Sequence, residues 1–124
     1  MTTTHSINLA IGQNNTPAWA HNGMGNVNPR DVTFSVGDTV VFQGVGGDIV
    51  LDFRGKSPFA ANPNSPPVPR FVYESNGGGK LVLVVTGPPN HKYDFDCGIR
   101  PQGGSVIRLQ AANHQFGDQF PVGN

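Results

Sequence analysis

Apolar and polar residues alternate with a period of two in several short segments of this chain. Ile7, Leu9 and Ile11, for example, are separated by small or polar residues. Because successive side chains of a strand point to opposite faces, this alternation predicts short strands that each have one buried face. The predicted strands cover residues 7–11, 32–36, 39–43, 49–53, 70–74, 80–86, 91–96 and 105–112, with a further short strand around 18–21.

Turn-forming residues separate these segments, and no window shows the periodicity of a helix. The chain contains 17 glycines and 11 prolines. Seven or eight short strands separated by such turns predict an all-β sandwich with at most one short helical turn, placed in residues 54–69. We expect a single domain over residues 1–124, with long loops at about 12–31 and 54–69 and an irregular C-terminal tail at about 113–124.

Composition and charge exclude several classes of protein. The 124 residues include eight basic and eight acidic side chains, so the formal net charge is zero. There is no basic stripe for nucleic acid and no apolar run long enough to cross a bilayer, so we expect neither a nucleic-acid partner nor membrane insertion. The first residues lack the pattern of a secretory signal, which predicts a cytoplasmic location. Because Cys97 is the single cysteine, the fold cannot contain an internal disulfide.

Three segments of the chain together resemble the cupredoxins. Residues 32–42 are typical of two apolar strands joined by a glycine turn, and residues 46–53 of a glycine turn followed by a strand. Residues 93–106 are typical of a strand that ends at the cysteine and continues into a loop and a second strand. With these segments the chain is similar to plastocyanin- and pseudoazurin-type cupredoxins from about residue 7 to residue 109. The resemblance implies a cupredoxin-like Greek-key sandwich or barrel, with the copper-ligand loops at one end.

The positions at which cupredoxins hold copper carry different side chains in this chain. A blue-copper site uses two imidazoles, one thiolate and usually a weak thioether. By the resemblance, the vestigial ligand positions are Asp48, Cys97, Arg100 and Ser105. An arginine stays protonated and cannot coordinate a metal. We therefore expect no type 1 copper site and no other cofactor. In their place we predict a charge pair between Asp48 and Arg100, with Ser105 able to hydrogen-bond to either.

Little in the sequence points to catalysis. An activated thiol needs a base within hydrogen-bond distance, and no sequence pattern supplies one for Cys97. Asp94 and Asp96 alternate with aromatic residues and share one strand face, which we expect to be solvated. The chain is therefore predicted not to be an enzyme.

Two classes of function remain. The first is a non-catalytic binding or interaction module on a copper-free cupredoxin-like scaffold, with an unidentified protein or small molecule as its partner. The two long loops would form the contact surface through Trp19, Met24 and Phe59, unless these side chains pin the loops to the sandwich. The alternative is a metal-handling or electron-transfer protein in which Cys97 and recruited histidines bind the metal. The histidines of the chain are His5, His21, His91 and His114.

Overall fold

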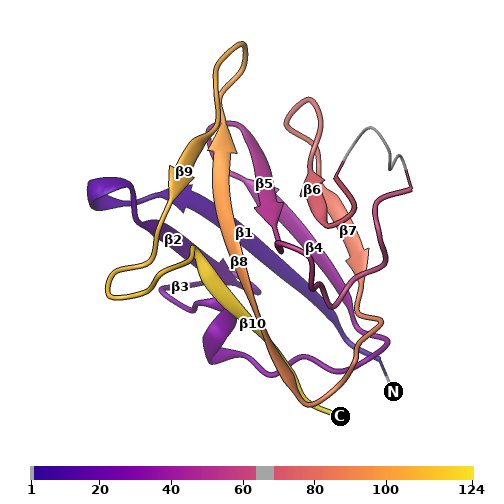
Figure 1. Ribbon diagram of the computed structural model, residues 1–124. Coiled ribbons are helices and arrows are strands. Elements are labelled where there is room, and N and C mark those ends of the chain that lie inside the picture. The colour runs from indigo at the N-terminus through magenta and orange to yellow at the C-terminus, as the bar shows by residue number, and fades with distance from the viewer. Residues whose placement is uncertain (1, 64–68) are drawn as a thin grey trace.

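The computed structural model, which describes residues 2–63 and 69–124, consists of strands arranged in two sheets (Figure 1). The strands are β1 (Thr4–Ile11), β2 (Pro17–His21), β3 (Met24–Gly25), β4 (Thr39–Gly44), β5 (Asp48–Asp52), β6 (Val72–Glu74), β7 (Leu81–Val84), β8 (His91–Arg100), β9 (Ile107–Leu109) and β10 (Asp118–Val122). The described residues contain no α-helix and two 3-10 turns, η1 (Gln13–Asn15) and η2 (Pro29–Asp31). The predicted all-β class is therefore confirmed. In the described part of the chain, no helix has the length and apolar character needed to span a membrane.

The strands pair into two open, five-stranded sheets. The first sheet has the order β3-β2-β1-β4-β7, and β1 runs parallel to β4. The second sheet has the order β10-β8-β5-β6, with β9 also paired to β8. The long strand β8 changes partners along its length, because β10 pairs with its first half while β5 and β9 pair with its second half. Neither sheet closes on itself, so strands with an unpaired edge remain.

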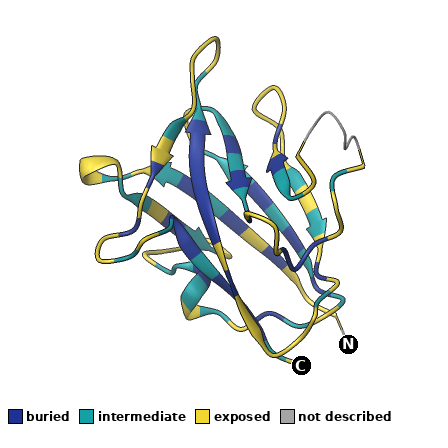
Figure 2. Cartoon of the chain, viewed as in Figure 1, coloured by how far each residue is buried: buried dark blue, intermediate teal, exposed yellow. Residues whose placement is uncertain are grey.

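The core lies between the two sheets, where the buried residues gather (Figure 2). It is rich in aromatic side chains. Ile7 and Leu9 of β1 and Phe42 of β4 are fully buried, while the residues between them are more exposed, as a period of two requires. Phe34 and Phe120 stack with their ring centroids 3.9 Å apart. An aromatic pair of this kind contributes about 0.5–1.5 kcal/mol beyond the burial of its apolar surface. This stack ties the segment before β4 to the second sheet.

The strand predicted for residues 32–36 is not formed. Phe34 alone makes a β-bridge, to Val122, and both its backbone N–H and its C=O bond to the C-terminal segment. The alternation that suggested a strand instead reflects the complete burial of Phe34, with Val36 left largely exposed.

The irregular C-terminal tail predicted for residues 113–124 is also wrong, because this segment contains β10. Phe120 is fully buried and Val122 nearly so, and the strand is hydrogen-bonded to the first half of β8. The strand was not predicted because it contains Pro121, and proline normally interrupts a sheet. It is accommodated here because β10 lies at the sheet edge, where one side needs no N–H donor.

The loop predicted for residues 12–31 contains more regular structure than expected. It holds β2, which confirms the strand predicted around residues 18–21, and also β3 and both 3-10 turns. The prediction of at most one helical turn, in residues 54–69, is therefore wrong. The second turn begins at a proline and is closed by a capping box between Asn28 and Asp31, which are local signals for a helical turn. Part of the other long loop, residues 64–68, lies outside the described residues.

Gly47, in the turn between β4 and β5, lies directly against the backbone of β8. A Cβ atom at Gly47 would lie 2.3 Å from the carbonyl oxygen of Arg100, so the backbone would have to move. We expect Gly47→Ala to lower the free energy of unfolding by roughly 1–3 kcal/mol, as overpacking does. Gly25→Ala is the matched control, because a Cβ atom there meets no atom within 4 Å. Denaturant unfolding measures both variants, and equal losses would contradict the packing described.

Candidate functional site

The structure brings Asp48 and Arg100 together, but the two side chains do not pair. They lie opposite each other across β5 and β8. Arg100 donates instead to the carboxylate of Glu74, with N···O distances of 2.7 and 3.3 Å. Asp48 accepts from Ser75 Oγ at 3.0 Å and from the N–H of Gly78 at 2.7 Å. The long side chain of Arg100 reaches Glu74 in β6, whereas the short side chain of Asp48 finds its hydrogen-bond donors in the turn after β6. The predicted charge pair is therefore wrong.

The other two vestigial positions are Ser105 and Cys97. Ser105 is exposed in the loop between β8 and β9. Cys97 was predicted at a strand end but lies inside β8, between Leu51 of β5 and Leu109 of β9. Cys97 is three residues from Arg100, or about 10 Å along an extended strand. The four positions therefore do not converge on one point.

The thiol of Cys97 is enclosed by the sheet and by its neighbours. Cys97 is 3% exposed, and its Sγ lies 3.8 Å from the carbonyl oxygen of Leu109. Burial raises the pKa of this thiol far above its usual value, and the nearby Asp118 and Asp96 raise it further. The residues that the structure describes contain no group of three or more His, Cys, Asp or Glu side chains arranged to hold a metal ion.

The burial and raised pKa of Cys97 predict an unreactive thiol in the native protein. The thiolate is the nucleophile in alkylation, and both its population and its access are suppressed here. We expect iodoacetamide at pH 8 to label the native chain far more slowly than the chain unfolded in guanidinium. Mass spectrometry follows both reactions, and rapid labelling of the folded chain would contradict the enclosed position of Cys97.

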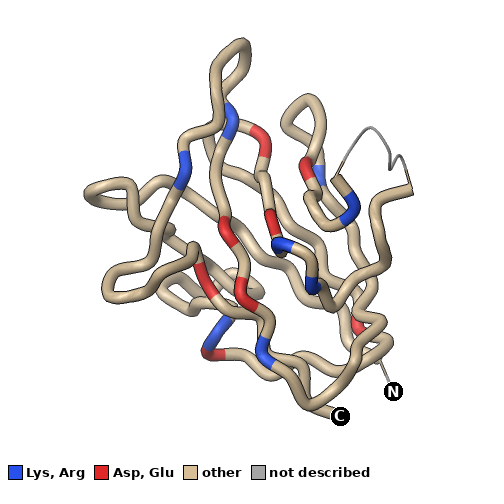
Figure 3. The backbone as a smooth tube through the Cα atoms, in the orientation of Figure 1, with Lys and Arg blue, Asp and Glu red and all other residues tan. Residues whose placement is uncertain are grey.

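Asp94 and Asp96 do not both lie on a solvated face as predicted. Asp94 is exposed, but Asp96 is buried and accepts hydrogen bonds from Arg54 at 2.5 Å and Arg108 at 3.0 Å. The two arginines come from the segment after β5 and from β9, so they cover the carboxylate from two sides. The charged residues are otherwise scattered over the molecule (Figure 3).

Two of the three predicted surface residues belong to the core. Trp19 and Phe59 are each 2% exposed, so the prediction that they form an interaction surface is wrong. Trp19 packs edge-on against Phe95, and Phe59 contacts the rings of other core aromatics. They pin the two loops to the sandwich, which is the other possibility that the sequence left open. Met24 is 67% exposed, so its place on an interaction surface stays a prediction.

The most apolar strand of the chain, β7, lies at the edge of the first sheet (Figure 1). Its residues, Leu81–Val84, include no charged side chain, and Val82 and Val84 are 58% and 48% exposed. Natural proteins usually protect edge strands with charge, proline or short length. The edge strand β10 contains a proline, and the edge strands β3 and β6 have only two and three residues. The four residues of β7 form a longer edge than β3 or β6 and include neither a charge nor a proline.

The backbone of β7 offers hydrogen-bonding groups on its open side. Val85, just after the strand, donates its N–H to Asp38 and accepts from Gly37, both on the β4 side, whereas Thr86 donates in the opposite direction, to Pro58. Successive residues of a strand direct these groups to opposite sides. Thr86 directs its N–H away from β4, so Val84 and Val82, two and four residues earlier, direct their N–H and C=O groups to the same open side.

A groove of about 450 Å³ runs beside this edge. Its lining residues are Phe59, Ala60, Ala61, Asn62, Pro63, Tyr73, Glu74, Leu81, Val82, Leu83, Val84 and Thr86. One wall is held by Tyr73, whose hydroxyl donates to the carbonyl oxygen of Ala60 at 2.8 Å. At one end, Phe59 forms an antiparallel bridge with Val85. The sequence indicated that β7 is apolar, but only the pairing order shows that it is an open edge next to a groove.

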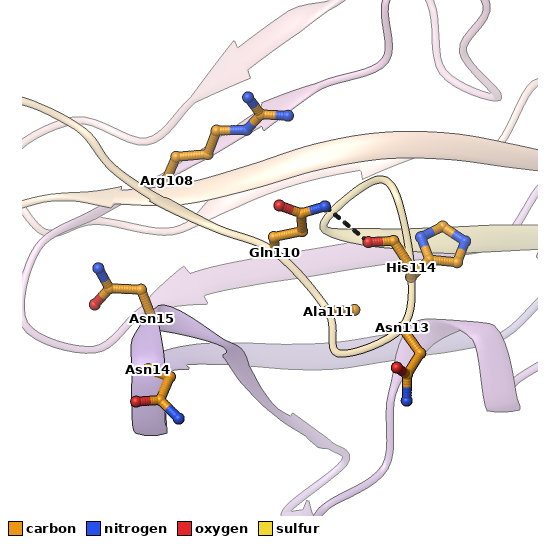
Figure 4. A pocket seen from close by; sticks show the side chains of 7 residues that line it. All are labelled: Asn14, Asn15, Arg108, Gln110, Ala111, Asn113 and His114. Carbon is orange, nitrogen blue, oxygen red and sulfur yellow. Dashed lines mark hydrogen bonds between the residues drawn. The ribbon is translucent and has the colours of Figure 1, made fainter.

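A second, polar depression of about 530 Å³ lies near η1 and the end of β9 (Figure 4). Its lining residues are Asn14, Asn15, Arg108, Gln110, Ala111, Asn113 and His114. Gln110 already donates to the carbonyl oxygens of His114 and Gln115, and Arg108 to Asp96. Alanine is the one apolar residue in the lining, whereas ligand sites usually bury much apolar surface. This depression therefore offers a ligand less than the groove beside β7.

A hydrogen-bonded chain of three titratable side chains lies where β1 begins. His5 Nε2 is 3.0 Å from Asp38 Oδ2, and His5 Nδ1 is 2.9 Å from His21 Nε2. His5 and Asp38 are buried, and Asp38 also accepts from the backbone N–H groups of Thr3 and Ser35. Burial works to raise the pKa of Asp38, but these hydrogen bonds outweigh it and lower the pKa. Burial and, to a lesser degree, the nearby His5 lower the pKa of His21. No sequence spacing indicated this cluster.

The lowered pKa of His21 predicts that the fold loses stability in mild acid. The unfolded chain protonates this histidine near pH 6.5, its ordinary pKa, whereas the folded chain does so only at lower pH. The unfolded state therefore binds more protons, and stability falls as the pH drops below about 6.5. The same sign applies to Asp38 at a lower pH, near its ordinary pKa of 3.8.

His21→Gln should remove the first of these two steps, because an amide does not titrate. We expect the free energy of unfolding, measured between pH 7.5 and 5.5 with a chelator present, to fall less in His21→Gln than in the wild type. The exposed His91 supplies the control, and His91→Gln should keep the wild-type dependence. An unchanged pH dependence in His21→Gln would contradict the assignment.

No protein-family model, curated protein or solved structure matches this chain.

Proposed function

We propose that this chain is a non-catalytic interaction module that binds an extended segment of a partner protein by strand addition to β7. The observation that carries the proposal is an uncharged, apolar edge strand on which the backbone groups of Val82 and the N–H of Val84 face away from β4. In strand addition, main-chain hydrogen bonds supply affinity, and side-chain pockets on alternate positions supply specificity. The groove beside β7 is such a pocket.

The direction and side-chain pattern of the partner segment follow from the geometry of the β7 edge. The bridge between Phe59 and Val85 is antiparallel, so a partner strand that continues from it would also run antiparallel to β7. Its side chains would alternate between the groove, beside Leu81 and Leu83, and the outer face, beside the two exposed valines. The partner segment is therefore extended, with an apolar side chain at every second position.

The same proposal includes the scaffold, a cupredoxin-like Greek-key sandwich that lacks the type 1 copper site. The strand order supports it, because β1 pairs with β4, β4 with β7, and β5 with β8, so the chain crosses repeatedly between the two sheets. The side chains at the ligand positions support the absence of copper there. The guanidinium of Arg100 is hydrogen-bonded to the carboxylate of Glu74. The carboxylate of Asp48 accepts hydrogen bonds from the turn after β6.

The alternative, a metal centre built on Cys97, has less support. The thiol is buried, its pKa is raised, and its hydrogen-bond acceptor is a backbone carbonyl rather than a histidine. We therefore do not place an electron-transfer function at this residue.

Selection from a displayed library of random decapeptides tests strand addition directly. We expect selected peptides to alternate apolar and polar residues. Val82→Lys places a charge on the edge, and Val84→Pro removes one outward N–H, so each should weaken binding by about tenfold or more. On binding, the amides of Val82 and Val84 should become protected from hydrogen exchange.

Val45→Lys is the matched control, because Val45 is 56% exposed, like Val82, but lies away from β7. It should leave binding unchanged. Equal binding by wild type and Val82→Lys, or protection at residues outside β7, would contradict strand addition. Concentration-dependent dimerisation that Val82→Lys abolishes would identify the added strand as a second copy of this chain.

A further inference from the structure

The chain of contacts from Asp38 through His5 to His21 orients the two imidazole rings toward each other. Both carboxylate oxygens of Asp38 accept backbone N–H groups, from Thr3 and from Ser35, so Asp38 acts as a hydrogen-bond acceptor. Its contact with His5 Nε2 therefore requires the proton of His5 to be on Nε2. In the neutral tautomer with this proton, Nδ1 of His5 directs its lone pair at His21 Nε2, which lies 2.9 Å away.

This arrangement matches that of histidines that ligate metals. A ligating imidazole commonly donates its other N–H to a carboxylate, which fixes the tautomer and orients the ring. Two nitrogens bound to one ion at about 2.0–2.1 Å lie roughly 3.3–3.5 Å apart. His5 Nδ1 and His21 Nε2 would therefore have to separate by only about half an ångström to admit an ion. His21 needs only a shift of its proton from Nε2 to Nδ1, so no net proton is released.

A third donor lies next to the two imidazoles. Met24 is the cross-strand partner of His21 in the hairpin of β2 and β3, so the two side chains share one face of the sheet. Asn22 and Gly23, both with positive φ, form the turn of this hairpin. Hydrogen bonds between Asn22 and Ser6 hold the turn against β1, which fixes this register. Met24 is 67% exposed, so its thioether is free to turn toward the histidines.

We propose that His5, His21 and Met24 form a binding site for a soft transition-metal ion, Cu(I), with Asp38 orienting His5. Imidazole and thioether donors together favour Cu(I), because thioether sulfur is a soft ligand and imidazole also suits copper. The edge of the Phe34 ring covers one side, with centroids 4.7 Å from His5 and 6.4 Å from His21.

This site goes beyond the proposed strand addition and is independent of it. It uses none of the four vestigial ligand positions, and it lies at the start of β1, far from the loop between β8 and β9 (Figure 1). Cys97 takes no part in it.

Anaerobic titration with Cu(I) against a chromophoric chelator tests the proposal, and Zn(II) is the second probe. We expect one Cu(I) per chain, bound more tightly than Zn(II). His21→Gln should weaken Cu(I) binding by about 100-fold or more, because one of two imidazoles is lost. Met24→Leu should weaken it by about tenfold and remove the sulfur scatterer from the copper X-ray absorption spectrum.

His91→Gln and Cys97→Ser serve as controls, and both should bind Cu(I) like the wild type. Thermal unfolding of the metal-free variants establishes that each is folded before titration. Undiminished binding in His21→Gln, a sulfur scatterer that persists in Met24→Leu, or loss of binding in Cys97→Ser would overturn the site. Preference for Zn(II) over Cu(I) would overturn the assignment of the metal.

Discussion

The parallel ladder between β1 and β4 is the interaction on which the rest of the structure depends. It runs from the pair Thr4 and Thr39 to the pair Leu9 and Gly44. Parallel strands cannot be joined by a tight hairpin, so a long connection must separate them. That connection contains β2 and β3, which cover one side of β1. The other side of β4 is left to β7, and the common start of the two strands places His5 beside Asp38.

Local pattern predicted most strands but not their neighbours. Alternation located β1, β4, β5 and β7, since each buries one face against the core. The order of strands depends on contacts between distant segments, which alternation does not contain. The apolar character of β7 was therefore visible in the sequence, whereas its place at an edge was not. Strand β10 was missed for a local reason, because a proline such as Pro121, the fourth of its five residues, is typical of a loop.

The candidate sites were harder to predict than the strands. Asp48 and Arg100 were correctly placed close together, because the register of β5 and β8 sets backbone positions. The side-chain partners of these two residues were not predicted correctly, because the long side chain of Arg100 reaches past Asp48 to Glu74. Trp19 and Phe59 were assigned to the surface because they fall in the loops predicted from the sequence, although large aromatics bury the most apolar area wherever they occur. His5, His21 and Asp38 are brought together by three different segments, so no spacing could reveal them.

The bridge between Phe59 and Val85 sets a limit on assembly at β7. An edge that is open along its whole length can act as a template for polymerisation, each added strand exposing a new edge. Here Pro58 already occupies the backbone N–H groups of Thr86 and Gly87. An incoming chain must therefore leave the sheet where the bridge begins. The molecule's own loop therefore limits how long a strand added to β7 can be.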